Sequence, residues 1–296
     1  MRRYLIAILT CLTCLALAQT AAQATPPNTG NFMTPFTTAL ISPSTAPPNR
    51  SVGKLYLRFP NGATESCSAA VVDANNQSTL ITASHCVYST FKGGLATSAT
   101  FAPAYHDGIK PFGEWSSLRI VPSGPWVLSG HSHFDFAFVV LRHDPFGRYV
   151  ENVVGGLPIA FNQPRDQAYH LLGYPGVPNP PYNGQQLWAC DSTYGGDVYD
   201  PDPDEQYGPP IMYTGCSFDH GASGGPWLNP QGTVSSVIST TFSNHPNIVG
   251  GPYLGDDATA LFASVTGTAP AKKCKRRKGH KSAVAAKKKC KKKHRR

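Results

Sequence analysis

Charged residues are scarce in this sequence and are divided unevenly along it. Lys, Arg, Asp and Glu make up only 15% of the 296 residues. All seventeen acidic residues lie within positions 25–271, beside nine basic ones, whereas residues 272–296 hold fifteen basic and no acidic side chains. The formal charge of +9 therefore describes a mildly acidic body with a strongly basic tail. Hydrophobic residues account for 41% of the chain, which excludes disorder of the whole.

Long apolar runs are also rare, because only Leu5–Ala18 forms one. Two arginines precede this run, and Ala22-Gln23-Ala24 follows it as a small-x-small cleavage site, so residues 1–24 are predicted to be a signal peptide. The run is too short to span a bilayer. We therefore expect a secreted, soluble protein. Leu12-Thr13-Cys14 leaves a lipoprotein-type signal as the alternative.

No apolar pattern of helical period lasts three turns before Thr259. From Ser51 onward the chain instead shows short runs typical of strands, such as 52–59 and 134–141, separated by Gly- and Pro-containing turns. This pattern predicts an all-β sandwich or barrel assembly in one domain. Residues 25–50 are rich in Pro, Thr and Ser and are predicted to be a leader or pro-segment without packed structure.

Six of the eight cysteines remain after removal of the signal peptide, an even number that suits an oxidising compartment. The sequence does not fix their pairing. One bridge within each region of the chain is the simplest arrangement, and it would join Cys67 to Cys86, Cys190 to Cys216, and Cys274 to Cys290.

Residues 191–205 hold six acidic side chains and two prolines. Clustered carboxylates suit calcium, but the Asp200-Pro-Asp202-Pro-Asp204 spacing lacks the glycine turn of an EF-hand loop. We therefore expect a solvated acidic loop, with calcium binding as the alternative. EDTA added during thermal melting tests this, since an unchanged midpoint would remove the calcium hypothesis.

The segment Gly221-Ala222-Ser223-Gly224-Gly225-Pro226 places one serine among three glycines. A serine hydroxyl is a weak nucleophile and needs a base within hydrogen-bond reach, together with amide donors for the oxygen that becomes negative. Glycines allow a tight loop to turn its N–H groups toward one point. Because Gly, Ser and Pro are also ordinary turn residues, the catalytic interpretation depends on a base and an acid elsewhere.

His85 is the best candidate for the base, because it follows a β-rich run and stands beside a cysteine that could fix it through a bridge to Cys67. Asp135 begins a strongly apolar strand, where burial of its charge would be costly without a partner. His85 would be that partner and Asp135 would hold its ring in one tautomer. Asp107 and Asp144 are the weaker alternatives for the acid.

These residues resemble a known family. Thr82-Ala83-Ser84-His85-Cys86, Asp135-Phe136-Ala137 and the Ser223 segment, in this order and at separations of 50 and 88 residues, are similar to the three signatures of chymotrypsin-fold (trypsin-like) serine peptidases. The opening Val52-Gly53-Lys54-Leu55 and the spacing from Cys216 to Ser223 resemble the bacterial V8-like, glutamyl endopeptidase-like branch. The resemblance covers about residues 51–265.

The resemblance implies two six-stranded antiparallel β-barrels, about 52–150 and 155–265, with the active site between them. It implies a catalytic His85, Asp135 and Ser223, and an oxyanion hole formed by the N–H groups of Gly221 and Ser223. It requires no cofactor or metal. Candidates for the wall of the specificity pocket are Ser217, His220, Ser239 and Thr240.

Two departures from the family pattern change the expectations. Ala222 stands where the animal digestive enzymes have an aspartate that pairs with the freed N-terminus, so that route to activation is absent. Ile238 stands near the position of a histidine that helps glutamate-cleaving relatives to bind their substrate, so glutamate specificity is not expected.

The predicted function is that of a secreted serine endopeptidase, acting as a monomer on protein or peptide substrates. A non-catalytic secreted binding protein on the same fold is the alternative. The basic segment 272–296 is predicted to be extended, either tethering the protein to an anionic cell-envelope polymer or serving only as a solubilising tail.

Overall fold

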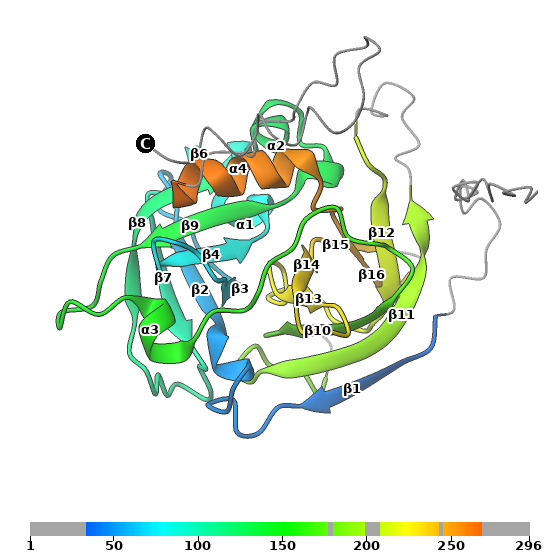
Figure 1. The fold of residues 1–296 in the computed structure, drawn as a ribbon, viewed down its shortest axis with the longest axis horizontal. Coiled ribbons are helices and arrows are strands. Elements are labelled where there is room, and N and C mark those ends of the chain that lie inside the picture. The colour runs from blue at the N-terminus through cyan, green and yellow to red at the C-terminus, as the bar shows by residue number, and fades with distance from the viewer. Residues whose placement is uncertain (1–33, 177–179, 199–207, 243–244, 268–296) are drawn as a thin grey trace, which may run out of the picture.

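The computed structural model describes residues 34–176, 180–198, 208–242 and 245–267, and these form an all-β protein with two sheet systems side by side (Figure 1). The predicted signal peptide, the basic tail, Cys274 and Cys290 lie outside the described residues. No helix in the described ranges is long and apolar enough to cross a membrane.

The first sheet closes on itself as the predicted six-stranded barrel, in the order β2-β3-β4-β9-β8-β7, with all pairs antiparallel. Inward-facing Leu55, Phe101 and Val139 are fully buried in its core. The strands are β2 (Val52–Arg58), β3 (Thr64–Val71), β4 (Thr79–Thr82), β7 (Ser98–Pro103), β8 (Trp115–Pro122) and β9 (Ala137–Leu141).

The second sheet is curled but does not close into the predicted second barrel. Its strands follow the order β14-β13-β10-β11-β12-β16-β15, with β1 paired to β11 as an eighth strand. They are β1 (Phe36–Leu40), β10 (Ala168–Gly173), β11 (Trp188–Val198), β12 (Ile211–Gly215), β13 (Pro226–Leu228), β14 (Val234–Val237), β15 (Thr240–Phe242) and β16 (His245–Gly251).

The two ends of this sheet are β14 and β15, which do not pair with each other. One continuous strand in their place would close the sheet into a barrel. At this point the chain crosses from one neighbour to the other, since the Ile238 N–H donates to Gly225 O at 2.8 Å and the Ser239 N–H donates to Gly250 O at 2.9 Å. The expectation of two six-stranded barrels is therefore correct for the first and wrong in detail for the second.

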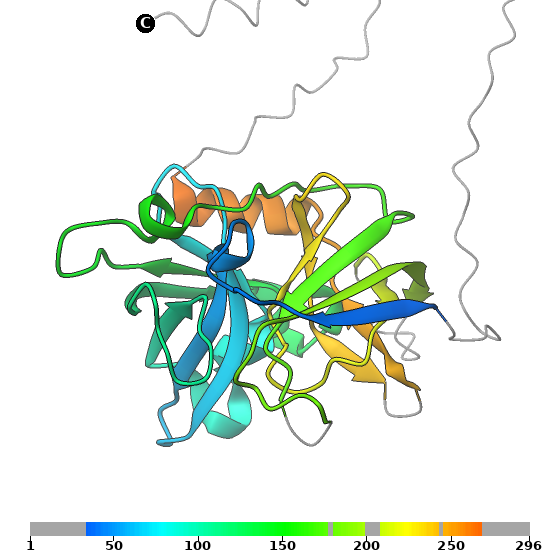
Figure 2. The same ribbon diagram turned by 90° about the horizontal axis from the view of Figure 1, so that it is seen from below.

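The prediction that residues 25–50 lack packed structure is wrong for the part that the structure describes. Strand β1 pairs with β11 from Phe36 opposite Ser192 to Leu40 opposite Trp188, and Figures 1 and 2 show it running along the outside of the second sheet. The sequence of Phe36–Leu40 shows no alternation of apolar and polar residues, because this edge strand leaves most of its side chains exposed. The folded body thus begins before Ser51.

Helices are few and short, apart from the last. Helix α4 (Asp256–Thr266) lies across the first barrel, where Phe262 packs against Phe138 with ring centroids 5.3 Å apart. Two aspartates in its first turn suit the positive end of the helix dipole. The remaining helices are α1 (Ser84–Val87), α2 (Gly124–Ser129), α3 (Val150–Val154) and the 3₁₀ turns η1 (Asn49–Ser51), η2 (Thr90–Lys92) and η3 (Ser132–Phe134); β5 (Tyr88–Ser89) and β6 (Gly94–Leu95) form a separate hairpin.

The two sheet systems are joined by buried polar contacts as well as by apolar packing. Lys54 of β2 is only 7% exposed, and its Nζ donates to Gly184 O at 2.7 Å on the other side of the junction. Burial lowers the pKa of this ammonium group. Disulfides join Cys67 to Cys86 and Cys190 to Cys216, so one bridge lies in each half, as predicted for these two regions.

Candidate active site

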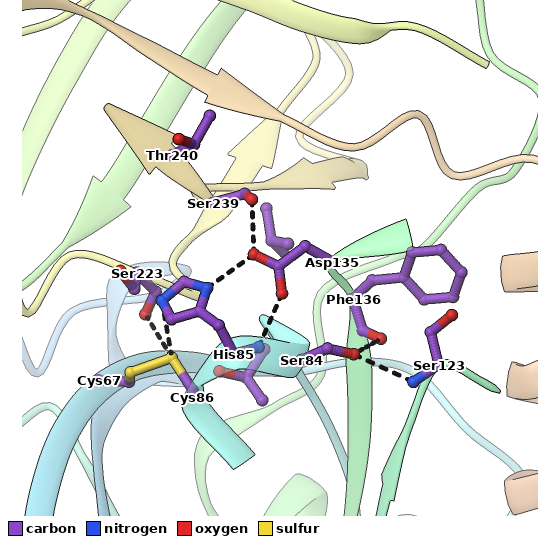
Figure 3. Close-up of polar contacts among 12 residues, drawn as sticks. Cys67, Ser84, His85, Cys86, Ser123, Asp135, Phe136, Ser223, Ser239 and Thr240 are labelled. Atoms are coloured by element: carbon purple, nitrogen blue, oxygen red, sulfur yellow. Dashed lines mark hydrogen bonds and ion pairs between the residues drawn. A yellow bond between two sulfur atoms is a disulfide. The ribbon is translucent and has the colours of Figure 1, made fainter. Parts of the chain in front are cut away.

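His85 and Asp135 meet at the edge of the first barrel. The ring Nδ1 of His85, on helix α1, lies 2.6 Å from Oδ2 of Asp135, which follows η3 (Figure 3). A carboxylate only accepts hydrogen bonds, so Nδ1 carries the proton and Nε2 is left with a lone pair. The pairing expected from sequence is present, whereas Asp107 and Asp144 contact Gln186 and Arg148 instead.

Asp135 is almost completely buried, and three donors meet its charge. Its side chain is 2% exposed. Besides the His85 ring, the backbone N–H of His85 donates to Oδ1 at 2.7 Å, and the hydroxyl of Ser239 donates to Oδ2 at 2.6 Å. These bonds offset the cost of removing the carboxylate from water and fix its orientation.

Helix α1 is attached to the segment after Asp135 by a further contact. The buried hydroxyl of Ser84 donates to Phe136 O at 2.6 Å and accepts from the Ser123 N–H at 3.0 Å. The residues next to His85 and Asp135 in the chain, Ser84 and Phe136, are thus also bonded to each other. The distance between His85 and Asp135 therefore does not depend on a single bond.

The electrostatics of the pair make the His85 ring more basic. Burial lowers the pKa of His85, but the charge and the hydrogen bond of Asp135 act in the opposite direction and prevail, so the pKa lies above its usual value. The His85 side chain is still one-third exposed and lines the cleft, and its ring lies between Asp135 and Ser223 (Figure 3). Such a ring can accept a proton from a neighbouring hydroxyl and stabilise the resulting positive charge.

Ser223 lies on the opposite side of the His85 ring from Asp135 (Figure 3). Both residues adjoin the sulfur of Cys86, which is 3.8 Å from His85 Nε2 and 3.7 Å from Ser223 O. The loop requires glycine after the serine: Gly224 has φ +81°, and a Cβ there would come within 2.0 Å of Thr82 Oγ1. This close approach brings the loop of the second sheet against the strand that leads to His85.

The peptide groups that carry the N–H of Gly221 and of Ser223 are each fixed by a hydrogen bond to their carbonyl oxygen. The carbonyl preceding Gly221 accepts from Gly176 N–H at 2.7 Å, and the carbonyl preceding Ser223 accepts from Gly225 N–H at 2.9 Å. In a trans peptide the C=O and N–H groups point in opposite directions. Within the described ranges neither N–H donates to a backbone carbonyl, and both residues line the cleft. They are thus available to a negatively charged oxygen.

Ser68 of β3 ties this loop to the first barrel and is missed by sequence reasoning. Its fully buried hydroxyl donates to Gly221 O at 2.8 Å and accepts from Tyr174 N–H at 2.9 Å, while its own N–H donates to Ser223 O at 2.8 Å. No motif marks this residue, because its role arises only when the two halves meet.

Three of the four residues predicted for the pocket wall line the central cleft, and the fourth does not. His220, Ser239 and Thr240 line the central cleft, a space of about 850 Å³ around His85 and Ser223. Ser217 is not among its lining residues, because its hydroxyl is 2.8 Å from the Tyr182 hydroxyl. Ser239 lines the cleft, but its hydroxyl serves Asp135.

The model of the trypsin-like peptidase domain matches residues 67–237, more than half of the chain. The chain belongs to the trypsin-like peptidase family. The predicted family is thereby confirmed, and the matched range of this trypsin-like peptidase contains His85, Asp135 and Ser223.

Known relatives agree with this family. The solved structure of the thermostable serine protease AL20 from an extremophilic microorganism is 36% identical with a TM-score of 0.64, covering 74% of this chain and 98% of that one. The glutamyl endopeptidase of Bacillus licheniformis is 34% identical over 101 residues, which are 33% of this chain and 30% of the relative.

A second curated relative carries a name of another class. The extracellular metalloprotease of Bacillus subtilis strain 168 is 31% identical over 106 residues, covering 36% of this chain and 33% of the relative. The trypsin-like peptidase described here therefore spans about a third of the length of the curated relatives that it matches.

The one cluster of three potential metal ligands among the described residues does not suit a metal ion. The single group of potential ligands found in them is Cys67, His85 and Cys86, and both cysteines are joined in a disulfide. A disulfide sulfur offers no thiolate, and one histidine alone is not a metal site. In the acidic loop, Asp191 pairs with His170 and Asp197 with Arg165, while residues 199–205 lie outside the described ranges.

Proposed function

We propose that this protein is a secreted serine endopeptidase that hydrolyses peptide bonds through Ser223, His85 and Asp135. The observation that carries the proposal is the buried Asp135 bonded to His85 Nδ1, with Ser223 beyond the opposite edge of the ring. Burying a carboxylate is costly, and a buried carboxylate paired with a histidine beside a cleft is typical of catalytic sites.

The proton transfers follow from the tautomer of His85. With Nδ1–H bonded to Asp135, Nε2 accepts the proton of the Ser223 hydroxyl as that oxygen attacks the peptide carbonyl. The imidazolium that forms is stabilised by the Asp135 charge and then gives its proton to the leaving amine. Water repeats the two transfers on the acyl-enzyme, and the carboxyl product leaves.

The negative oxygen of the tetrahedral intermediate would lie against the N–H groups of Gly221 and Ser223. Both peptides are oriented before substrate binds, by bonds to Gly176 and Gly225. Preorganised donors need no rearrangement at the moment of reaction, and loss of one such donor costs about a hundred- to a thousandfold in rate.

Reaction with a fluorophosphonate tests the catalytic proposal. We expect the purified full-length protein to become labelled on Ser223, and labelling to disappear in Ser223→Ala and in His85→Ala. Ser235→Ala is a matched control, since its buried hydroxyl has no partner among the described residues. Failure of the wild type to react would instead support the non-catalytic alternative.

The basic segment 272–296 is proposed to hold the enzyme to an anionic cell-envelope polymer by releasing counterions. The full-length protein should elute from isolated envelopes at higher salt than a 1–271 truncation. Identical elution profiles would leave the segment with a solubilising role only.

A further inference from the structure

The charged side chains that line the cleft are already paired with one another. Lys92 contacts the Glu65 carboxylate, and His220 Nδ1 lies 2.7 Å from Asp219 Oδ1. Apart from His85, the described lining residues contain no further ionisable acid or base of the Lys, Arg, His, Asp or Glu type. A charged substrate side chain would therefore lose its water without finding an unpaired group of opposite charge in the cleft.

The wall nearest the nucleophile loop is apolar. Phe218 and Ile238 line the cleft although they are only 1% and 3% exposed. Ile238 is fixed there by backbone bonds to both Gly224 and Gly225, each between 2.7 and 2.8 Å. The polar group that could have altered this wall, the Ser217 hydroxyl, faces Tyr182 instead.

The rim of the cleft carries apolar side chains in full contact with water. Phe91 on η2 is 95% exposed and Leu128 on α2 is 88% exposed; these are the two most exposed large apolar side chains in the described part of the chain. Trp126, on the same helix as Leu128, lies 6.3 Å from the His85 ring between centroids. Because these side chains line the cleft, an apolar group bound there would cover them and remove them from water.

We propose that the cleft recognises an extended polypeptide with apolar side chains at the cleaved bond and beside it, and discriminates against acidic ones. The occupant is the substrate itself, because the apolar wall and rim are continuous with the cleft around Ser223. This inference rests on the proposed function and gives its substrate class. It separates the chain from the specificity stated in the name of its glutamyl endopeptidase relative.

Binding to the Ser223→Ala variant tests the recognition apart from catalysis. Fluorescent peptides that differ only in the central residue should bind at least about tenfold more tightly with Leu or Phe than with Glu. With the intact enzyme, a peptide library should be cleaved next to apolar residues. Equal or tighter binding of the Glu or Lys peptide would overturn the proposal.

The rim residues are tested by Phe91→Ser and Leu128→Ser in the full chain, with Phe146→Ser as the matched control. Phe146 is 81% exposed but does not line the cleft. We expect affinity for the apolar peptide to fall about tenfold in each rim variant and to be unchanged in the control. Equal affinities in all three would refute the role of the rim. Apolar binding without fluorophosphonate labelling would refute the proposed catalysis and leave the recognition standing.

Discussion

The two halves of the molecule hold their parts of the site in different ways. The first barrel is closed, and it fixes His85 and Asp135 through contacts among its own residues, including Ser84. The second sheet is open beside the Ser223 loop, and that loop is held largely by partners from outside it, above all Ser68 of the first barrel. The acid–base pair thus depends mainly on its own half, with Ser239 as one donor from the second sheet, whereas the nucleophile and its amide donors depend on contact between both halves.

The largest effect should come from breaking the pair inside the first barrel. Asp135→Asn removes the charge and favours the wrong tautomer of His85, so kcat should fall about ten-thousandfold, the size of this effect in a Ser-His-Asp triad. Because the Asp135 charge raises the pKa of His85, the acid limb of the remaining activity should move to lower pH. Asp144→Asn, which alters a carboxylate paired with Arg148, is the control and should leave the profile unchanged.

A smaller effect is expected from cutting the link between the halves. Ser68→Ala leaves Gly221 O and Tyr174 N–H without their partner, and the oxyanion amides lose their support. We expect kcat to fall about ten- to a hundredfold with little change in KM, and binding of a peptide boronate to weaken by a similar factor. Ser68→Thr, which keeps the hydroxyl, should recover part of the rate.

If Ser68→Ala lowered only the melting temperature and left kcat and boronate binding unchanged, the link would be structural and the contrast between the halves would fail. Ser235→Ala measures the cost of losing a buried hydroxyl that makes no bond among the described residues.

Ser239→Ala should have a weaker effect and the opposite direction in pH. The variant removes one of three donors to Asp135, and a bond to a charged group is worth about 1.5–3 kcal/mol. Because two donors remain, we expect the lower end of this range, a fall in kcat/KM of about tenfold. With less stabilisation from Ser239, the carboxylate should attract the imidazolium more strongly, and the acid limb should move to higher pH. A shift to lower pH would contradict the geometry assigned to Asp135.

Removing β1 should change the activity least of all these variants. Its main effect should be on the stability of the second sheet. A chain that begins at Thr34 keeps this strand, whereas one that begins at Ile41 exposes the edge of β11. The shorter chain should melt at lower temperature and lose hydrogen-exchange protection in β11, while protection in β2 and β9 stays unchanged. Equal loss of protection in both halves would show that they unfold as one unit.

The sequence was sufficient for the parts of the site that lie next to their own motifs. His85, Asp135 and Ser223 are candidates because each stands in a short motif that resembles a signature of the family. Strand periodicity predicts only an all-β sandwich or barrel, and the six-stranded barrel is what the resemblance implies. The two described disulfides were also found, since each bridge joins cysteines of the same half.

The remaining features depend on contacts between distant segments. Strand β1 is invisible locally, since its residues show no buried face and it is stabilised by pairing with β11, about 150 residues away. Ser68 acts on a loop 153 residues later. Ser239 lines the cleft, but its position in the sequence does not reveal that its hydroxyl donates to Asp135.

The rate of Ser223 labelling by a fluorophosphonate as a function of pH, measured with peptide mapping, tests most directly that the base of one half activates the serine of the other. The wild type should be labelled on Ser223 with a rate that rises with pH through one group whose pKa lies above the usual histidine value of about 6.5. In Asp135→Asn that dependence should move to lower pH at a much reduced rate. A pH-independent rate, or a label on another residue, would contradict the account.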